Sequence, residues 1–188
     1  LGLVKVVNDI LDLAILDSGQ VKLIMEPFAI HELLVSALEL IKNRIKQKSL
    51  HFQFDCLPSI GWMSGDKERL KQVFYKLLSN SVNFTPPRGH ITLRGKRERD
   101  LIIITIDDTG VGIPKDEKLK IFDAFHKGTS DLREKKQNKD HDSDHEYGLG
   151  LGLAIVKRFV EMHNGSLEIK SRVGRGTKVV CCFPDLQK

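Results

Sequence analysis

Two adjacent carboxylates end an apolar stretch of the chain and are followed by closely spaced glycines. Asp107 and Asp108 come at the end of LIIITIDD (101–108), whose apolar part predicts a buried strand, and Gly110 and Gly112 follow. A carboxylate at the bottom of an apolar pocket can accept a hydrogen bond from an exocyclic amine such as that of adenine. Glycine lets the backbone approach a flat ring because it has no Cβ. The same residues taken alone are also typical of a turn after a strand.

Two further groups of residues have the types that nucleotide chemistry uses. Asn80 lies at the edge of the apolar face of a predicted helix, where its amide oxygen can ligate a hard cation such as Mg²⁺. Gly148, Gly150 and Gly152 precede another predicted helix, and N–H groups at a helix N-terminus favour phosphate oxygens. Each group alone is more simply a surface amide or a flexible turn. Their occurrence together with Asp108, in this order and with a polar loop before the last, favours a nucleotide site.

The elements that must position these residues follow from hydrophobic periodicity. Helical spacing predicts helices over about 3–16, about 30–48, between Asp66 and Pro86, over about 116–125, and after the glycine-rich GLGLG. Extended or alternating stretches predict strands at 21–28, 51–56, 90–98, 101–107, 166–171 and 177–183. Asp66 is the expected N-cap of its helix. Helices interleaved with antiparallel strands predict an α/β fold with the form of a two-layer sandwich.

Composition favours one globular domain with a helical extension. The chain has 188 residues, of which 40% are hydrophobic, and it begins with Leu, which we interpret as a piece of a longer protein. We find no membrane span, signal peptide or zinc-site spacing, and three cysteines do not form a disulfide framework, which favours a cytoplasmic setting. The net charge of +5 comes from interspersed basic and acidic residues without a basic stripe, which argues against a nucleic-acid partner.

Five motifs in order resemble the C-terminal catalytic, ATP-binding domain of sensor histidine kinases, in the superfamily of gyrase B and Hsp90. LLSNSVNFTP resembles the N box, DDTGVGIP the first glycine box, IFDAFHKG the phenylalanine box, YGLGLGLAIVKRFVEMHNGSLEIKS the second glycine box, and GRGT the closing glycine motif. NDILDLAILDSGQVKL resembles the end of the dimerisation and phosphotransfer domain. The resemblance implies that residues 1–20 end a dimerisation helix and that 21–188 form the catalytic domain, with an ATP lid over about 127–147. It also implies a mixed sheet covered by helices on one face.

The resemblance implies a role for each motif residue. Asp108 would bind the adenine amino group, Asn80 would hold the Mg²⁺ that bridges the phosphates, and Asn80 and Lys76 would be the catalytic positions. The residues implied to contact ATP are Asn80, Asn83, Asp108, Gly110, Gly112, Ile113, Phe122, Phe125, Lys127, Gly148, Leu149, Gly150, Leu151, Gly152 and Thr177. The γ-phosphate would pass to a histidine on the upstream dimerisation domain and then to a response regulator. The full-length protein would be a homodimer, and this fragment would contact neither nucleic acid nor membrane.

The sequence departs from the family pattern at the acceptor and in the N box. The phosphoacceptor motif would lie upstream of Leu1; His31 lacks the expected proline and is interpreted as a surface histidine. Many members have Asn where this chain has Lys76 and Lys where it has Asn83, and both positions share a helix face with Asn80. The ammonium of Lys76 either partly replaces the metal ion or impairs binding of Mg·ATP. The alternative is that Lys76 points to solvent and that Asn83 is a tolerated change.

The altered N box leaves a second class of function open. Some relatives, typified by DivL, resemble histidine kinases but act chiefly as partners of other signalling proteins, and LDLAILDSG is similar to that group. A hydrolysing ATPase of the gyrase or chaperone kind is disfavoured, because those enzymes place a glutamate base where Lys76 stands. Nucleotide binding and the identity of the upstream acceptor discriminate between the first two classes.

Overall fold

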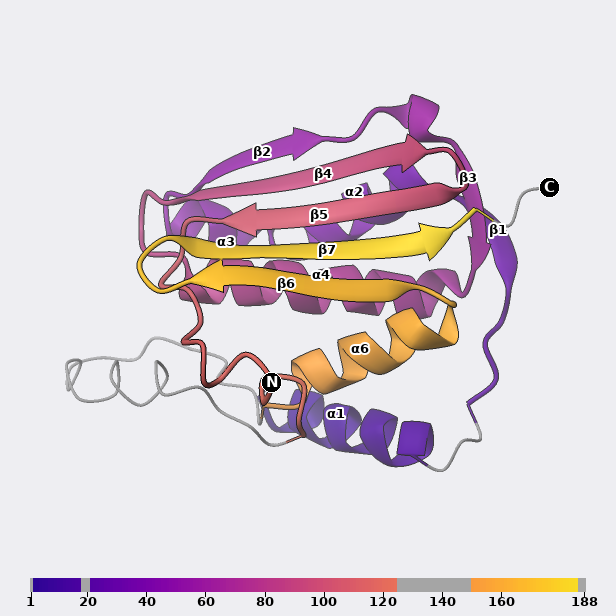
Figure 1. Ribbon diagram of the computed structural model, residues 1–188, viewed down its shortest axis with the longest axis horizontal. Helices are drawn as coiled ribbons and strands as arrows, with labels where there is room; N and C mark the ends of the chain where they lie inside the picture. The colour runs from indigo at the N-terminus through magenta and orange to yellow at the C-terminus, as the bar shows by residue number, and fades with distance from the viewer. Residues whose placement is uncertain (1, 18–20, 125–149, 186–188) are drawn as a thin grey trace.

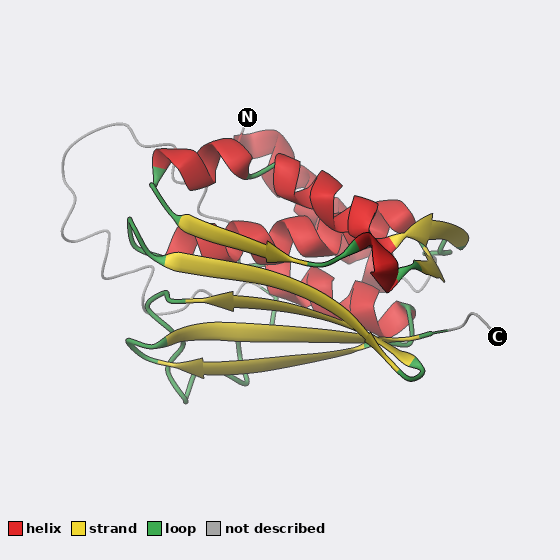
Figure 2. Cartoon of the chain, turned by 90° about the horizontal axis from the view of Figure 1, so that it is seen from above, coloured by secondary structure: helices red, strands yellow, loops and turns green. Residues whose placement is uncertain are grey.

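A five-stranded sheet with helices on one face forms the body of the chain (Figures 1 and 2). The computed structural model describes residues 2–17, 21–124 and 150–185. The sheet has the order β2 (His51–Asp55), β4 (His90–Glu98), β5 (Leu101–Asp108), β7 (Gly176–Pro184) and β6 (Ser166–Arg172). The β2–β4 pair is parallel and the other neighbouring pairs are antiparallel. The predicted two-layer sandwich with a mixed sheet is therefore confirmed.

Helices pack on one face of the sheet, and a further helix lies beside them. α2 (Ile30–Glu39), α4 (Lys67–Phe84) and α6 (Gly152–Met162) cover one face, and α1 (Gly2–Asp17) lies along α6 (Figure 1). Alternation along the strands sends Leu93 and Ile104 into the core beneath the helices, where both are almost fully buried. In the described ranges, no helix combines the length and apolar character needed to cross a bilayer.

A small second sheet closes one end of the sandwich. β1 (Glu26–Ala29) pairs antiparallel with β3 (Trp62–Gly65), which follows a single 3₁₀ turn, η1 (Pro58–Ile60). The extended stretch over 21–28 was expected from sequence, and its last residues form β1. β3 was not expected, because four residues bounded by Gly61 and Asp66 are too few to show an alternating pattern.

Two predicted helices differ from the structure. The helix expected over 30–48 is divided into α2 and α3 (Lys42–Gln47). The break falls at Leu40, which is exposed, and Ile41, which is fully buried and has φ −113° and ψ −3°. The short helix expected over 116–125 is wrong for its described part: residues 115–124 form consecutive turns. Most of their hydrogen bonds span three residues, and Leu119 is 88% exposed, so no apolar face holds a helix there.

Asp66 joins three segments at the start of α4. Its side chain accepts the N–H of Arg69 at 3.0 Å, as an N-cap does, and also the N–H of Ile24 at 3.0 Å. Its own N–H donates to Nε2 of His163 at 2.9 Å, and the other ring nitrogen of His163 donates to the carbonyl of Phe159 at 2.7 Å. The imidazole must therefore be neutral to accept at Nε2, and its burial lowers its pKa.

The turn between β6 and β7 fixes the end of β5. Gly176 has φ +98°, and a Cβ at this position would lie 1.8 Å from the carbonyl oxygen of Asp108. Gly174, in the same turn, has φ +73°, but a Cβ there would meet nothing within 4 Å. Both glycines have a conformation that would strain any other residue, and they differ in whether a Cβ at that position has room.

Replacing His163 with Gln should flatten the acid limb of the stability profile. The folded pKa is lower than the unfolded value of about 6.5, so the unfolded chain takes up the proton first. The stability from neutral His163 is complete above about pH 6.5 and is lost as pH falls through the lowered folded pKa. Urea unfolding at several pH values measures it, with exposed His51→Gln as the control. Equal slopes for the wild type and His163→Gln would contradict this assignment.

Gly176→Ala should destabilise the chain far more than Gly174→Ala. Left-handed strain alone costs an L-residue about 1–2 kcal/mol, which is the expected effect at Gly174. At Gly176 the collision with the backbone of Asp108 adds to that strain, for a total of at least about 3 kcal/mol. The free energy of unfolding in urea measures both variants. Similar losses at the two positions would show that the contact with Asp108 is unimportant.

Candidate functional site

Asp108 is a buried carboxylate at the C-terminal end of β5. It is 7% exposed; Oδ1 accepts the N–H groups of Gly110 at 2.9 Å and Thr177 at 3.2 Å, and Oδ2 accepts the hydroxyl of Ser81 at 3.1 Å. Burial raises the pKa of Asp108, the three hydrogen bonds oppose that rise, and the charge of Asp107 adds to it. A carboxylate can accept about four hydrogen bonds. The donors found among the described residues therefore leave Oδ2 able to accept one more.

Asp107 lies on the opposite face of the sheet from Asp108. It falls within the strand predicted over 101–107; it is the penultimate residue of β5 and lies opposite Lys178, with 3.8 Å between the carboxylate and the ammonium. Successive strand residues point to opposite faces, so Asp107 is about half exposed while Asp108 faces the helices. The two carboxylates cannot act together on one ligand.

The glycines after Asp108 make room for the protein's own backbone. A Cβ at Gly110 would lie 2.7 Å from the carbonyl oxygen of Phe84, and one at Gly112, where φ is +73°, would lie 2.2 Å from that of Arg172. The structure therefore gives these glycines a reason that needs no ligand, and the approach of a flat ring stays a prediction. Their absence of side chains lets the loop after β5 pack against the end of α4 and the end of β6.

The polar face of α4 carries the altered N-box residues. Lys76, Asn80 and Asn83 are spaced at i, i+4 and i+7, so they lie along one face of the helix. Lys76 is 7% exposed, which overturns the alternative that it points to solvent. Asn80 and Asn83 are half-buried, and Asn80 directly precedes the Ser81 that binds Asp108. Asn83 Oδ1 accepts an N–H from the guanidinium of Arg44.

Two cations from the α3 region hold the end of α4. The Arg44 guanidinium donates to Ser79 Oγ at 2.9 Å in addition to Asn83. The Lys48 ammonium donates at 2.8–3.1 Å to the carbonyls of Val82, Asn83 and Thr85. These are carbonyls at a helix C-terminus, which lack partners within the helix and favour a positive charge.

The structure places the other implied ligands around the same end of the sheet. The N–H of Ile113 donates to Ser171 Oγ at 2.8 Å, and that hydroxyl also lies 2.8 Å from Thr177 Oγ1. Ser171 therefore links the first glycine box to the closing glycine motif. Phe122 is half-buried, and the ammonium of Lys157 in α6 lies 5.5 Å from the centre of its ring.

The start of α6 is the described part of the second glycine box. Gly150 has φ +76°, Leu151 is fully buried, and Gly152 is the first residue of the helix. Among the described residues no side chain caps this N-terminus, and a Cβ at Gly152 would meet nothing within 4 Å. The first N–H groups of a helix lack partners within the helix. Leu151 can offer a ligand its backbone but not its side chain. The predicted ligands Phe125, Lys127, Gly148 and Leu149, and the whole of the predicted lid over about 127–147, lie outside the described residues.

Sequence reasoning missed four polar residues of this site. Ser81 carried a usable signal, because a hydroxyl within the apolar face of an amphipathic helix needs a buried partner. Arg44, Lys48 and Ser171 carried none, because Arg44 and Lys48 contact residues more than 30 positions away and Ser171 contacts Ile113 at a separation of 58. Among the described residues no cluster of three His, Cys, Asp or Glu side chains could hold a metal ion, so Asn80 remains the candidate ligand.

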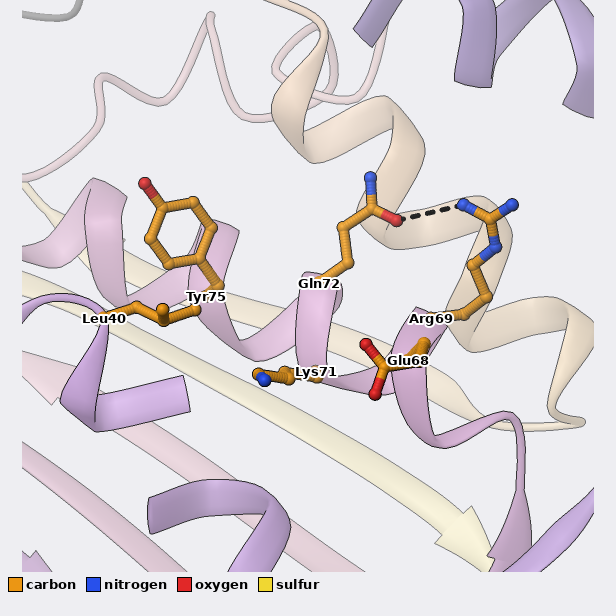
Figure 3. Close-up of a pocket in the computed structure, with 6 residues that line it drawn as sticks. All are labelled: Leu40, Glu68, Arg69, Lys71, Gln72 and Tyr75. Carbon is orange, nitrogen blue, oxygen red and sulfur yellow. Dashed lines mark hydrogen bonds between the residues drawn. The ribbon is translucent and has the colours of Figure 1, made fainter. Parts of the chain in front are cut away.

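A separate open pocket lies on the first turns of α4 (Figure 3). Its volume is about 400 Å³, and it is lined by Leu40, Glu68, Arg69, Lys71, Gln72 and Tyr75. Arg69 and Gln72 are hydrogen-bonded to each other at 3.3 Å and both bind Asp12 of α1, at 3.2 and 2.5 Å. Neither Asp108 nor Asn80 lines this pocket, so it is distinct from the candidate site.

Comparison with known proteins supports the nucleotide assignment. Residues 65–187 match the family described as histidine kinase-, DNA gyrase B-, and HSP90-like ATPase. The circadian input-output histidine kinase CikA of Synechococcus elongatus is 32% identical over 185 residues, covering 97% of this chain and 23% of that protein. The sensor protein DivL of Caulobacter vibrioides is 31% identical over 186 residues, covering 99% of this chain and 22% of that protein. The chain thus spans less than a quarter of either relative.

A solved structure shares the fold over almost the whole chain. Full-length ShkA in complex with AMPPNP superposes with a TM-score of 0.79 at 28% identity, covering 97% of this chain and 35% of that one. Fold, motif order and family match agree, and the match begins at Gly65, just before α4. The chain belongs to the family of histidine kinase-, DNA gyrase B- and HSP90-like ATPases, and its ATP-binding domain is of the histidine kinase type.

Proposed function

We propose that this chain binds ATP and works as the kinase domain of a two-component sensor histidine kinase. It would transfer the γ-phosphate to a histidine on an upstream dimerisation domain, for relay to a response regulator. The observation that carries the proposal is the buried Asp108 carboxylate, held by three donors from separate segments and able to accept one more N–H. A buried carboxylate is stabilised by each donor that it gains, and the amino group of adenine is a donor that suits the remaining position.

The described residues fit a nucleotide in three places. Asp108 would accept the adenine N–H, the uncapped start of α6 at Gly152 would receive phosphate oxygens, and Asn80 would hold Mg²⁺ together with those phosphates. ATP, when bound, supplies the phosphoryl group that is transferred. The chain's own contribution is to orient the nucleotide and neutralise its charge, as is usual in phosphoryl transfer. Gly110, Gly112, Ile113 and Thr177 would hold Asp108 and its loop in place.

The acceptor histidine is proposed to lie outside this chain. His31 is half-buried, its Nδ1 lies 2.8 Å from the carbonyl oxygen of Cys56, and its ring packs 5.4 Å from that of Phe54. These contacts give His31 a structural role and no link to the candidate site. The dimer, the response regulator and a cytoplasmic location are proposals that follow from the same family architecture. The three unpaired cysteines agree with a reducing compartment.

A second candidate is a degenerate kinase domain that acts by contacts with other signalling proteins, as proposed from the resemblance to DivL. The observation that favours it is Lys76, a buried cation one helical turn from the residue expected to hold Mg²⁺. Sequence identity does not discriminate between a working kinase domain and a degenerate one, because CikA and DivL are 32% and 31% identical to this chain. Nucleotide affinity discriminates between the two.

Asp108→Asn should abolish most nucleotide affinity, whereas Asp107→Asn should preserve it. Losing a charged hydrogen-bond acceptor at the base costs about 1.5–3 kcal/mol, which is about a 10- to 150-fold weaker Kd for ADP. Asp107→Asn makes the same chemical change at the neighbouring position on the solvent side of the sheet. Calorimetric titration measures both variants, with thermal melting to confirm folding. Equal affinities in the two variants would contradict the role of Asp108, and no wild-type binding at millimolar ADP would favour the degenerate domain.

Lys76→Asn should make binding of the triphosphate more dependent on magnesium. If the Lys76 ammonium partly replaces the metal, the wild type should bind AMPPNP with nearly the same affinity with and without Mg²⁺. In Lys76→Asn, binding without Mg²⁺ should fall about tenfold, since one nearby unit charge is lost. Lys71→Asn, the same substitution on another face of α4, is the control. A Mg²⁺ dependence unchanged by Lys76→Asn would reject the charge-substitution hypothesis.

A further inference from the structure

Arg44 brings a positive charge to the face of α4 that carries Asn80. Its guanidinium reaches across from α3 and donates to Ser79 Oγ at 2.9 Å and to Asn83 Oδ1. Arg44 is half-buried, and among the described residues no carboxylate forms an ion pair with it. Arginine has five N–H donors, so the two contacts leave donors for an anion. A positive charge in a half-buried site without an acidic partner favours an anionic ligand.

The contact also fixes the orientation of the Asn83 amide. Arginine has donors and no acceptor, so the oxygen of Asn83 must be the atom that faces it. The amide nitrogen of Asn83 is therefore turned away from Arg44, and its N–H groups are left to donate elsewhere. A hydrogen bond from a guanidinium also polarises the amide, which strengthens the N–H groups as donors. Asn80 lies one helical turn before Asn83, so the two amides are neighbours on the helix surface.

The position of Arg44 is held by a second contact of the same segment. Lys48 lies one helical turn after Arg44 and its ammonium binds three carbonyls at the end of α4, including that of Asn83. The α3 segment is thus attached to α4 through two side chains, and both of them contact Asn83. This geometry differs from that of an exposed arginine, whose side chain samples many rotamers before it meets a ligand.

We propose that Arg44 and Asn83 form a relay that binds the phosphate groups of the nucleotide, with Asn83 donating to a phosphate oxygen and Arg44 orienting it and supplying the positive charge. The proposal rests on the proposed function, because it needs a nucleotide in the site. It makes Arg44 a positioning residue that acts through Asn83. It also assigns a part of the phosphate subsite to α3, an element outside every motif identified in the sequence.

The test compares three ligands that share a base and differ in phosphates. Adenosine, ADP and AMPPNP are titrated into the wild type and Arg44→Gln, with Arg94→Gln as the control. Arg94 pairs with Asp55 and follows the core residue Leu93 in β4, so it points to the sheet face opposite the helices and its replacement removes the same charge away from the site. Arg44→Gln should weaken ADP and AMPPNP about tenfold and leave adenosine within about twofold. Its effect on ADP should shrink as salt is raised, because the effect is that of a charge.

Two further variants separate the relay from a merely structural role. Asn83→Leu should weaken ADP as Arg44→Gln does, and the double variant should be little worse than either one, because both changes break the same path. Arg44→Lys should restore part of the affinity by restoring the charge without the planar fork. Additive losses in the double variant would overturn the relay.

The outcomes also separate this proposal from the function on which it rests. If the wild type binds ADP and Asp108→Asn does not, but Arg44→Gln binds ADP normally, the proposed function stands and the relay is wrong. If Arg44→Gln weakens adenosine as much as ADP, Arg44 only supports the fold and the relay is wrong. If the wild type binds neither adenosine nor ADP, both proposals fail.

Discussion

The buried carboxylate of Asp108 is the point at which the segments of this site meet. Its hydrogen bonds come from α4 through Ser81, from the loop after β5 through Gly110, and from β7 through Thr177. Its carbonyl oxygen lies where a side chain at position 176 would have to be. Burial raises the pKa of the acid, and these three donors oppose that rise. The close backbone packing of the first and last glycine motifs follows from the need to bring those donors to one carboxylate.

The positive charges near Asn80 and Asn83 come from positions that differ from the family pattern. The N-box helix carries a buried lysine before Asn80 and an asparagine after it, where the family pattern has asparagine and lysine. Arg44 comes from a different helix and reaches the asparagine, so a cation remains next to that position although its source has changed. The structure thereby offers a physical reason why this N box can depart from the pattern without losing its charge. Arg44 does not make up for the other departure from the family pattern, which is the buried Lys76 in place of asparagine.

Sequence patterns predicted features that depend on neighbouring residues and missed contacts between residues far apart in the chain. The apolar alternation of β4 and β5, the amphipathic faces of the helices and the Asp66 cap each depend on neighbouring residues, and each could be read from the chain. The interruption of the 30–48 helix could not, because no glycine or proline marks the break at Leu40 and Ile41. Arg44 and Asn83 are 39 residues apart, so no pattern within either helix shows their contact. Asp108 was found because its position after an apolar strand is unusual, but the reason for the adjacent glycines required the three-dimensional packing.

The nucleotide site is tested most directly by a crystal structure of this chain with AMPPNP and Mg²⁺. We expect the exocyclic amine of adenine within hydrogen-bonding distance of the Asp108 carboxylate, about 2.7–3.2 Å. We also expect the phosphate groups over the face of α4 that carries Asn80 and Asn83. A nucleotide seated elsewhere, such as in the pocket beside Gln72 and Tyr75, would contradict this placement. So would crystals grown in saturating nucleotide in which Asp108 keeps its present partners and gains none.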